Sequence, residues 1–262
     1  MAFIEKLKDM NTSFINFVKE WRKLNAMKPL TKTLWILFFA IAMGYLESAV
    51  VVYLRELYYP DGFNFPLKVM AQDIAVTELY REAATLIMIL SVSILAAGLW
   101  LHRFAWFLVV FSVWDISYYI FLKLLLGWPE SLLTTDILFL LPSIWTGPVI
   151  APVINSLTMI LLAIVILKSR KGSEPLIRLS GLIWILLIAG SLIVLVAYMK
   201  DFASYVLDYR NLHVSAGIRI DQDLLSLSSQ FVPQSFDWWL FCTGVCMHLA
   251  AVVLIFISRK KS

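Results

Sequence analysis

Charged residues are scarce in this sequence. Only 15% of the 262 residues are Asp, Glu, Lys or Arg, whereas 61% are hydrophobic. Soluble domains carry about 25% charged and about 45–50% apolar residues, so this balance excludes an ordinary soluble domain. The short alternating segments of a membrane β-barrel are also missing. We therefore predict an all-α integral membrane protein, with the lipid bilayer as its first partner.

Cysteine and histidine are scarce as well. The two cysteines, Cys242 and Cys246, lie one helical turn apart in an apolar run, and we expect free thiols there because a structural disulfide joins separate segments. His102 and His248 are expected at different depths, which argues against a shared haem. The three histidines form no His-Glu-x-x-His pair. We predict no metal site and no cofactor.

Motifs for catalysis and for nucleic-acid binding are absent too. No Gly-rich phosphate-binding loop and no nucleophile elbow stands at the edge of an apolar run. The net charge of +4 comes from basic residues that flank apolar runs and form no patch with interleaved aromatics, which excludes nucleic acid as a partner. We assign no catalytic residues, and the sequence favours a role other than that of an enzyme.

Six apolar runs have the length of transmembrane helices. A helix needs roughly 20 apolar residues to cross about 30 Å of hydrocarbon, and it satisfies its own backbone hydrogen bonds there. We predict a six-helix membrane domain over residues 33–258, connected on one side by segments 55–76, 127–148 and 200–235. The six spans are placed at about 33–54, 77–101, 104–126, 149–167, 179–199 and 236–257.

Basic residues gather on one side of this arrangement. The N-terminal segment, the turn at His102 and Arg103, the loop 168–178 and the tail 259–261 hold most of the Lys and Arg. The positive-inside rule then places both termini in the cytoplasm. We predict a multi-pass protein of a bacterial-type inner (plasma) membrane.

Residues 1–32 combine an apolar stripe with lysines. Bulky apolar side chains recur at alternating four- and three-residue steps from Phe3 to Leu24, and most of the lysines project elsewhere. This pattern predicts an amphipathic helix lying on the cytoplasmic membrane surface. A coiled-coil partner helix is the alternative.

The segment 127–148 is too apolar for an ordinary loop and too interrupted for one helix. We predict a short interfacial helix over residues 130–141, ended by Pro142 and Pro148. The alternative is a re-entrant feature, in which broken backbone at membrane depth lines water or protein.

Ionisable residues inside the spans require a partner or a role, because burying them in hydrocarbon is expensive. At 1.5 Å per residue, two of them fall near the midplane and the others farther out on the non-cytoplasmic side. We predict a cavity that opens to that side. The predicted binding residues are Glu47, Arg81, Glu82, Asp115, Tyr119, Asn155 and His248. The alternative is that Glu47–Arg81 and Asp115–His248 are pairs that only stabilise helix packing.

Three functions follow from this interpretation. The first is the binding or permeation of a small solute or ion. The second is that of a non-catalytic subunit that contacts other membrane proteins in a larger complex. The third is an intramembrane enzyme that acts on a lipid-linked substrate and uses Asp115, Asp136 or Glu47 as acid or base. The sequence leaves the choice open.

Overall fold

The computed structural model describes residues 28–168, 170–171, 174–175, 179–215 and 224–260. Within these residues, six helices are long and apolar enough to cross a membrane, which indicates a multi-pass membrane protein. In chain order they are α2 (Pro29–Tyr58), α3 (Gln72–Ala96), α4 (Trp100–Leu126), α5 (Ile150–Leu167), α6 (Gly181–Ser215) and α8 (Trp238–Lys260). The short elements of the same ranges are β1 (Thr135–Phe139), β2 (Trp145–Pro148), β3 (Arg170–Lys171), β4 (Glu174–Pro175) and α7 (Leu224–Ser228).

Local sequence explains where several of these helices begin and end. α2 begins at Pro29, four residues before the predicted start of the first span, because proline is suited to the first turn of a helix. α4 ends at Gly127, which has a φ of +67° in the left-handed region that favours glycine. The predicted surface helix lies almost entirely in residues 1–27, outside the described residues, and stays a prediction.

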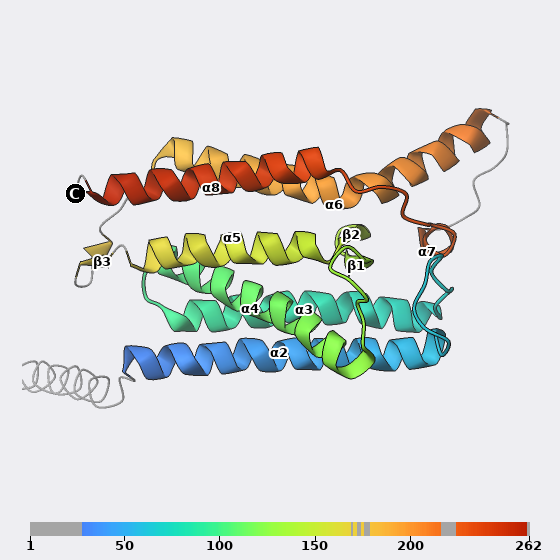
Figure 1. Cartoon of the computed structure of the whole chain (residues 1–262), viewed down its shortest axis with the longest axis horizontal. Coiled ribbons are helices and arrows are strands. Elements are labelled where there is room, and N and C mark those ends of the chain that lie inside the picture. The colour runs from blue at the N-terminus through green and yellow to red at the C-terminus, as the bar shows by residue number, and fades with distance from the viewer. Residues whose placement is uncertain (1–27, 169, 172–173, 176–178, 216–223, 261–262) are drawn as a thin grey trace, which may run out of the picture.

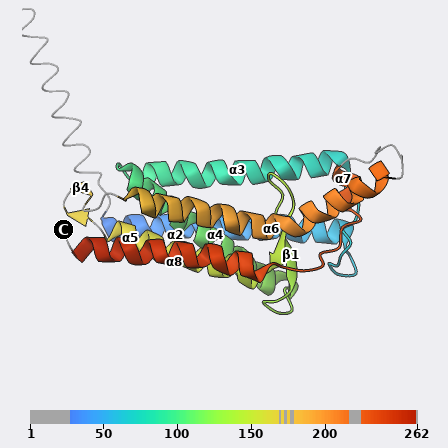
Figure 2. The same ribbon diagram turned by 90° about the horizontal axis from the view of Figure 1, so that it is seen from above.

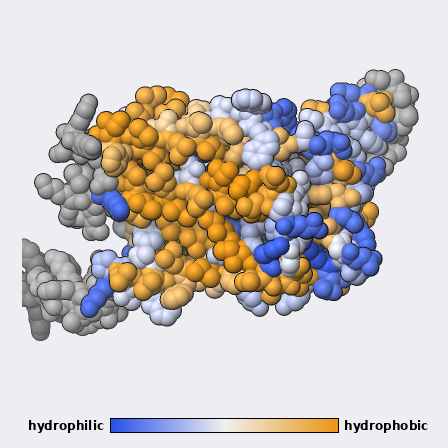
Figure 3. Space-filling model, in the orientation of Figure 1, coloured by the Kyte–Doolittle hydropathy of each residue, from blue (hydrophilic) through white to orange (hydrophobic). Residues whose placement is uncertain are grey.

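The six long helices form two groups (Figures 1 and 2). One group is α2, α3 and α4, and the other is α5, α6 and α8. α4 contacts α2, α3 and α5, while α6 lies along α8. α5 also contacts α8, so the α4–α5 interface joins the groups. The space-filling view shows a broad hydrophobic surface over the helices, with hydrophilic residues gathered toward the end that carries α7 (Figure 3).

Two helix crossings depend on glycine. A Cβ on Gly44 of α2 would lie 2.6 Å from the Cβ of Ser117 on α4. A Cβ on Gly244 of α8 would lie 2.7 Å from the carbonyl oxygen of Gly190 on α6. Small residues at such crossings let helix backbones approach closely, which is how helices gain packing energy in lipid.

The predicted interfacial helix at residues 130–141 is wrong. Its second half forms β1, which pairs with β2 as an antiparallel hairpin with Thr135 opposite Pro148 and Asp136 opposite Gly147. Thr, Ile and Phe in this stretch favour an extended strand, and Pro142 lies in the turn between the strands. The chain is therefore mostly helical, as predicted, with a hairpin that the all-α prediction missed.

The fifth span also differs from its prediction. The predicted span ends near residue 199 and the connecting segment 200–235 follows it, but α6 continues without a break to Ser215. No Gly or Pro occurs between residues 199 and 215, so nothing in the local sequence stops the helix at the change from apolar to polar residues.

Candidate functional site

A cavity of about 540 Å³ lies at the end of the bundle where α2 ends and α3 begins. Its walls come from α2, the connection 59–71, α3, α4 and the β1–β2 hairpin, with Phe202 of α6 and Ser228 of α7 at its margin. This end lies opposite the C-terminus (Figure 1). Most of the wall is apolar or aromatic, and the charged groups come from five segments: α2, the connection 59–71, α3, α4 and β1.

The structure brings five of the seven predicted binding residues to this cavity. They are Glu47, Arg81, Glu82, Asp115 and Tyr119. Asn155 and His248 are not among its lining residues. Both residues lie on helices of the second group, Asn155 on α5 and His248 on α8. The depth expected from the sequence does not show toward which neighbour a side chain points.

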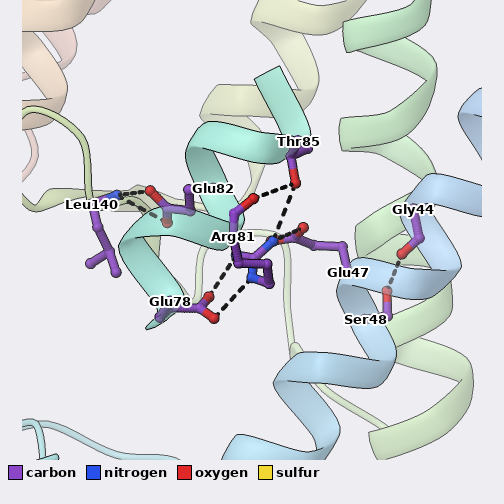
Figure 4. A network of polar contacts seen from close by, with 8 residues as sticks. All are labelled: Gly44, Glu47, Ser48, Glu78, Arg81, Glu82, Thr85 and Leu140. Carbon is purple, nitrogen blue, oxygen red and sulfur yellow. Dashed lines mark hydrogen bonds and ion pairs between the residues drawn. The ribbon is translucent and has the colours of Figure 1, made fainter. Parts of the chain in front are cut away.

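Arg81 is held by carboxylates from two helices (Figure 4). Its Nε donates to Glu78 Oε2 at 2.8 Å and its Nη2 donates to Glu78 Oε1 at 2.6 Å. Its Nη1 donates to Glu47 of α2, which confirms the predicted Glu47–Arg81 pair. Planar two-point pairing of this kind is the strongest form of carboxylate recognition by arginine. The network therefore bridges α2 and α3, which share few other contacts.

Glu82 contacts the hairpin instead of Arg81. The Glu82 carboxylate accepts the backbone N–H of Leu140 at 3.0 and 3.2 Å (Figure 4). The Glu82 side chain is buried. This bond attaches the turn after β1 to α3 and so fixes one wall of the cavity.

The predicted Asp115–His248 pair is wrong, because each residue has a different partner. Asp115 Oδ2 accepts a hydrogen bond from Ser156 of α5 at 2.8 Å, at the α4–α5 interface. His248 Nε2 lies 3.1 Å from Ser191 Oγ, at the α6–α8 interface. The two residues share a depth in the sequence prediction but face different neighbours.

Arg55 and Asp136 are cavity residues that the list of predicted binding residues omitted. Arg55 Nη2 lies 3.8 Å from Asp136 Oδ1, and the Asp136 carboxylate also accepts a hydrogen bond from Tyr119 Oη at 3.4 Å. Burial raises the pKa of Asp136 to about 7, although the Arg55 charge and hydrogen bonds oppose that shift. A sequence signal did exist, because Glu47, Val51 and Arg55 recur every four residues and so share one face of a helix.

A second hollow, of about 520 Å³, lies beside the start of α8. Lys200 Nζ donates to Asp237 Oδ2 at 2.5 Å there. That bond lowers the pKa of the partly exposed Asp237. Asp201, the third charged residue of this hollow, accepts the backbone N–H of Gln234 at 2.8 Å. The charged groups of this hollow are thus already engaged.

The arrangement in the first cavity is suited to binding. Within the described ranges, no group of three or more His, Cys, Asp or Glu side chains comes together in a way that could hold a metal ion. Comparisons of the chain with protein-family models, with curated proteins and with solved structures find no match.

Proposed function

We propose that this protein binds a small amphipathic molecule in the cavity between α2, α3, α4 and the β1–β2 hairpin. The ligand enters from the non-cytoplasmic side of a bacterial-type plasma membrane, with both chain termini in the cytoplasm. The described basic residues at the start of α2, the start of α4 and the end of α5 are Lys28, Lys32, Arg103 and Lys168. These helix ends and the cavity lie at opposite ends of the bundle (Figure 1), which supports this orientation.

The observation that carries the proposal is the combination of size and lining. A volume of about 540 Å³ falls within the range of roughly 300–1,000 Å³ that is typical of small-molecule sites. Such sites have mostly apolar and aromatic walls with a few fixed polar groups, and this cavity follows that pattern with Phe63, Leu79 and Phe139 beside Glu82 and Arg55.

Packing in the rest of the bundle favours binding over permeation. Toward the end that carries the C-terminus, α4, α5, α6 and α8 share an apolar core. Its buried members include Leu101, Ala105, Leu108, Leu162, Ile183, Leu187 and Ile255. A permeation path would need polar groups or a hydrated constriction through this region.

The contacts of two of the three acids named as catalytic candidates, Glu47 and Asp115, favour binding over acid–base catalysis. Glu47 is paired with Arg81, and Asp115 accepts a hydrogen bond from Ser156. A general acid or base must reach the proton it transfers, whereas these two carboxylates are engaged in contacts between helices. The role of a subunit in a larger complex stays a prediction from the sequence.

The test uses purified protein in phosphatidylcholine nanodiscs and three probes of equal chain length: hexanol, hexanoate and hexylamine. Saturation-transfer NMR measures binding, with empty nanodiscs as background. We expect at least one probe to bind and its binding to be lost in Ala75→Trp, because Ala75 lines the cavity and the indole would fill it.

The matched control is Ala84→Trp, on the same helix at an exposed position outside the cavity. This variant should bind as the unaltered protein does. No binding of any probe by the unaltered protein, or equal loss of binding in both variants, would refute the proposal.

A further inference from the structure

Arg55 occupies an unusual position in the cavity wall. Its side chain is only 11% exposed. The guanidinium carbon lies 3.9 Å from the centre of the Trp128 ring and 4.5 Å from the centre of the Phe63 ring. The two rings are nearly perpendicular, at 85°, with centres 6.0 Å apart, so they form a corner around the guanidinium. Cation–π contact of this kind stabilises the positive charge. It leaves the N–H groups, which point outward in the plane of the guanidinium, free to donate hydrogen bonds to other groups.

The residues that the structure describes leave the hydrogen-bonding capacity of the Arg55 side chain unused. A guanidinium has five N–H donors, and the nearest carboxylate oxygen, on Asp136, lies 3.8 Å away, beyond hydrogen-bond distance. Among the residues that the structure describes, none accepts a hydrogen bond from the Arg55 side chain. Arg81, by contrast, donates to two carboxylates in the same cavity.

The other cavity charges are better matched. Glu47 and Glu78 share Arg81, and Glu82 accepts a backbone N–H. Arg55 is therefore the partly buried charge in this wall that has most to gain from an incoming hydrogen-bond acceptor. Lys68 also lines the cavity and is exposed, which adds a second positive charge there.

We propose that Arg55 binds an oxyanion, a carboxylate or phosphate group, at the polar end of the ligand, while the apolar part of the ligand contacts the aromatic and aliphatic walls. This inference rests on the proposed function of the cavity. A planar guanidinium matches two oxygens of such a group at once. The raised pKa of Asp136, about 7, supports it, because a neutral Asp136 carboxyl near Arg55 would not repel an anion.

The experiment compares the binding of hexanoate, hexanol and hexylamine to the unaltered protein and to Arg55→Gln in phosphatidylcholine nanodiscs. We expect hexanoate to bind more tightly than the other two probes. In Arg55→Gln its dissociation constant should rise roughly 10- to 100-fold, the effect of losing charged hydrogen bonds, while hexanol binding stays unchanged. Arg55→Lys keeps the charge without the planar fork and should give an intermediate constant.

Two matched variants test specificity. Arg103→Gln removes an arginine whose Nε donates to the carbonyl of Ala97, outside the cavity, and should leave hexanoate binding unchanged. Lys68→Gln removes the exposed cation and should weaken hexanoate binding less than Arg55→Gln does. Tighter binding of hexylamine than of hexanoate, or unchanged hexanoate binding in a folded Arg55→Gln or Arg55→Lys protein, overturns the inference. The proposed function would survive that result, because Ala75→Trp tests it separately.

The oxyanion can belong to a free solute or to a lipid headgroup, and nanodisc composition distinguishes the two. If a headgroup occupies the site, phosphatidylglycerol nanodiscs should weaken hexanoate binding to the unaltered protein more than they weaken binding to Arg55→Gln. If a free solute is the ligand, the change of lipid should affect both proteins equally. Each result identifies the source of the group that Arg55 binds.

Discussion

The α2–α3 pair, which borders the cavity, and the α6–α8 pair are stabilised in different ways. Between α6 and α8, Gly190 and Gly244 bring the backbones into contact, and the one buried histidine of that interface lies beside Ser191. Between α2 and α3, contacts are few, and the long side chains of Glu47 and Arg81 span the distance. Small residues leave no room between helices, whereas long paired charges hold helices together at a separation that leaves a cavity.

This difference indicates where the protein can carry out a function. A tightly packed interface in lipid transmits no solute and exposes no polar group. An interface made from charged pairs is more expensive to bury and is a reason to expect a functional site. On this view Arg81 maintains the cavity and Arg55 binds within it.

The largest effect should come from removing the charge that bridges α2 and α3. Arg81→Gln leaves the carboxylates of Glu47 and Glu78 without their cation, and breaking this partly buried pair costs up to about 3 kcal/mol. We expect a clear fall in the thermal unfolding midpoint of the purified protein. The control is Arg103→Gln, which removes an arginine that donates to a carbonyl instead of a carboxylate. A midpoint as high in Arg81→Gln as in Arg103→Gln would show that the charged bridge does not maintain the cavity side.

A smaller loss is expected at the α6–α8 crossing. In Gly244→Ala the new Cβ would lie 2.6 Å from Val194 Cγ2 and 2.7 Å from the Gly190 carbonyl oxygen, so the backbones must separate. Overpacking of this degree costs about 2 kcal/mol, more than the helix propensity gained from alanine. Gly98→Ala is the matched control, because a Cβ there meets nothing within 4 Å. If the two variants unfold at the same temperature, close packing is not what stabilises this pair.

The six spans could be predicted from the sequence because each needs about 20 consecutive, mostly apolar residues to cross the hydrocarbon of the bilayer. The sequence predicted the Glu47–Arg81 pair because both residues fall at a similar depth and have opposite charge. It failed for Asp115 and His248, where depth agreed but the direction of each side chain did not. That direction depends on the packing of α4 against α5 and of α6 against α8, which a single sequence does not specify.

The hairpin was missed for a different reason. Residues 130–141 are apolar and lie between two spans, so an interfacial helix was a reasonable prediction from composition. The strand pairs Asp136 with Gly147, and that contact is not local in the sequence. Because Asp136 was placed on a helix, its contact with Arg55 could not be predicted, and neither could the unused donors of Arg55.

A pH-dependent effect is expected when Asp136 is compared with a neutral replacement. Burial raises the pKa of Asp136 from 3.8 to about 7. Between about pH 4 and pH 7 the unfolded chain loses this proton while the folded protein keeps it, so the stability of the folded protein falls as the pH rises through this interval. Asp136→Asn replaces this titrating carboxyl group with an amide that does not titrate. We therefore expect the unfolding midpoint of the variant, relative to that of the unaltered protein, to increase over the same interval and to level off above pH 7. Hexanoate binding should also weaken above pH 7 in the unaltered protein, where an ionised Asp136 repels the carboxylate beside Arg55, and should change less in Asp136→Asn. Parallel pH profiles for the two proteins, in both unfolding and binding, would show that Asp136 does not titrate in this range and would remove its support for an oxyanion at Arg55.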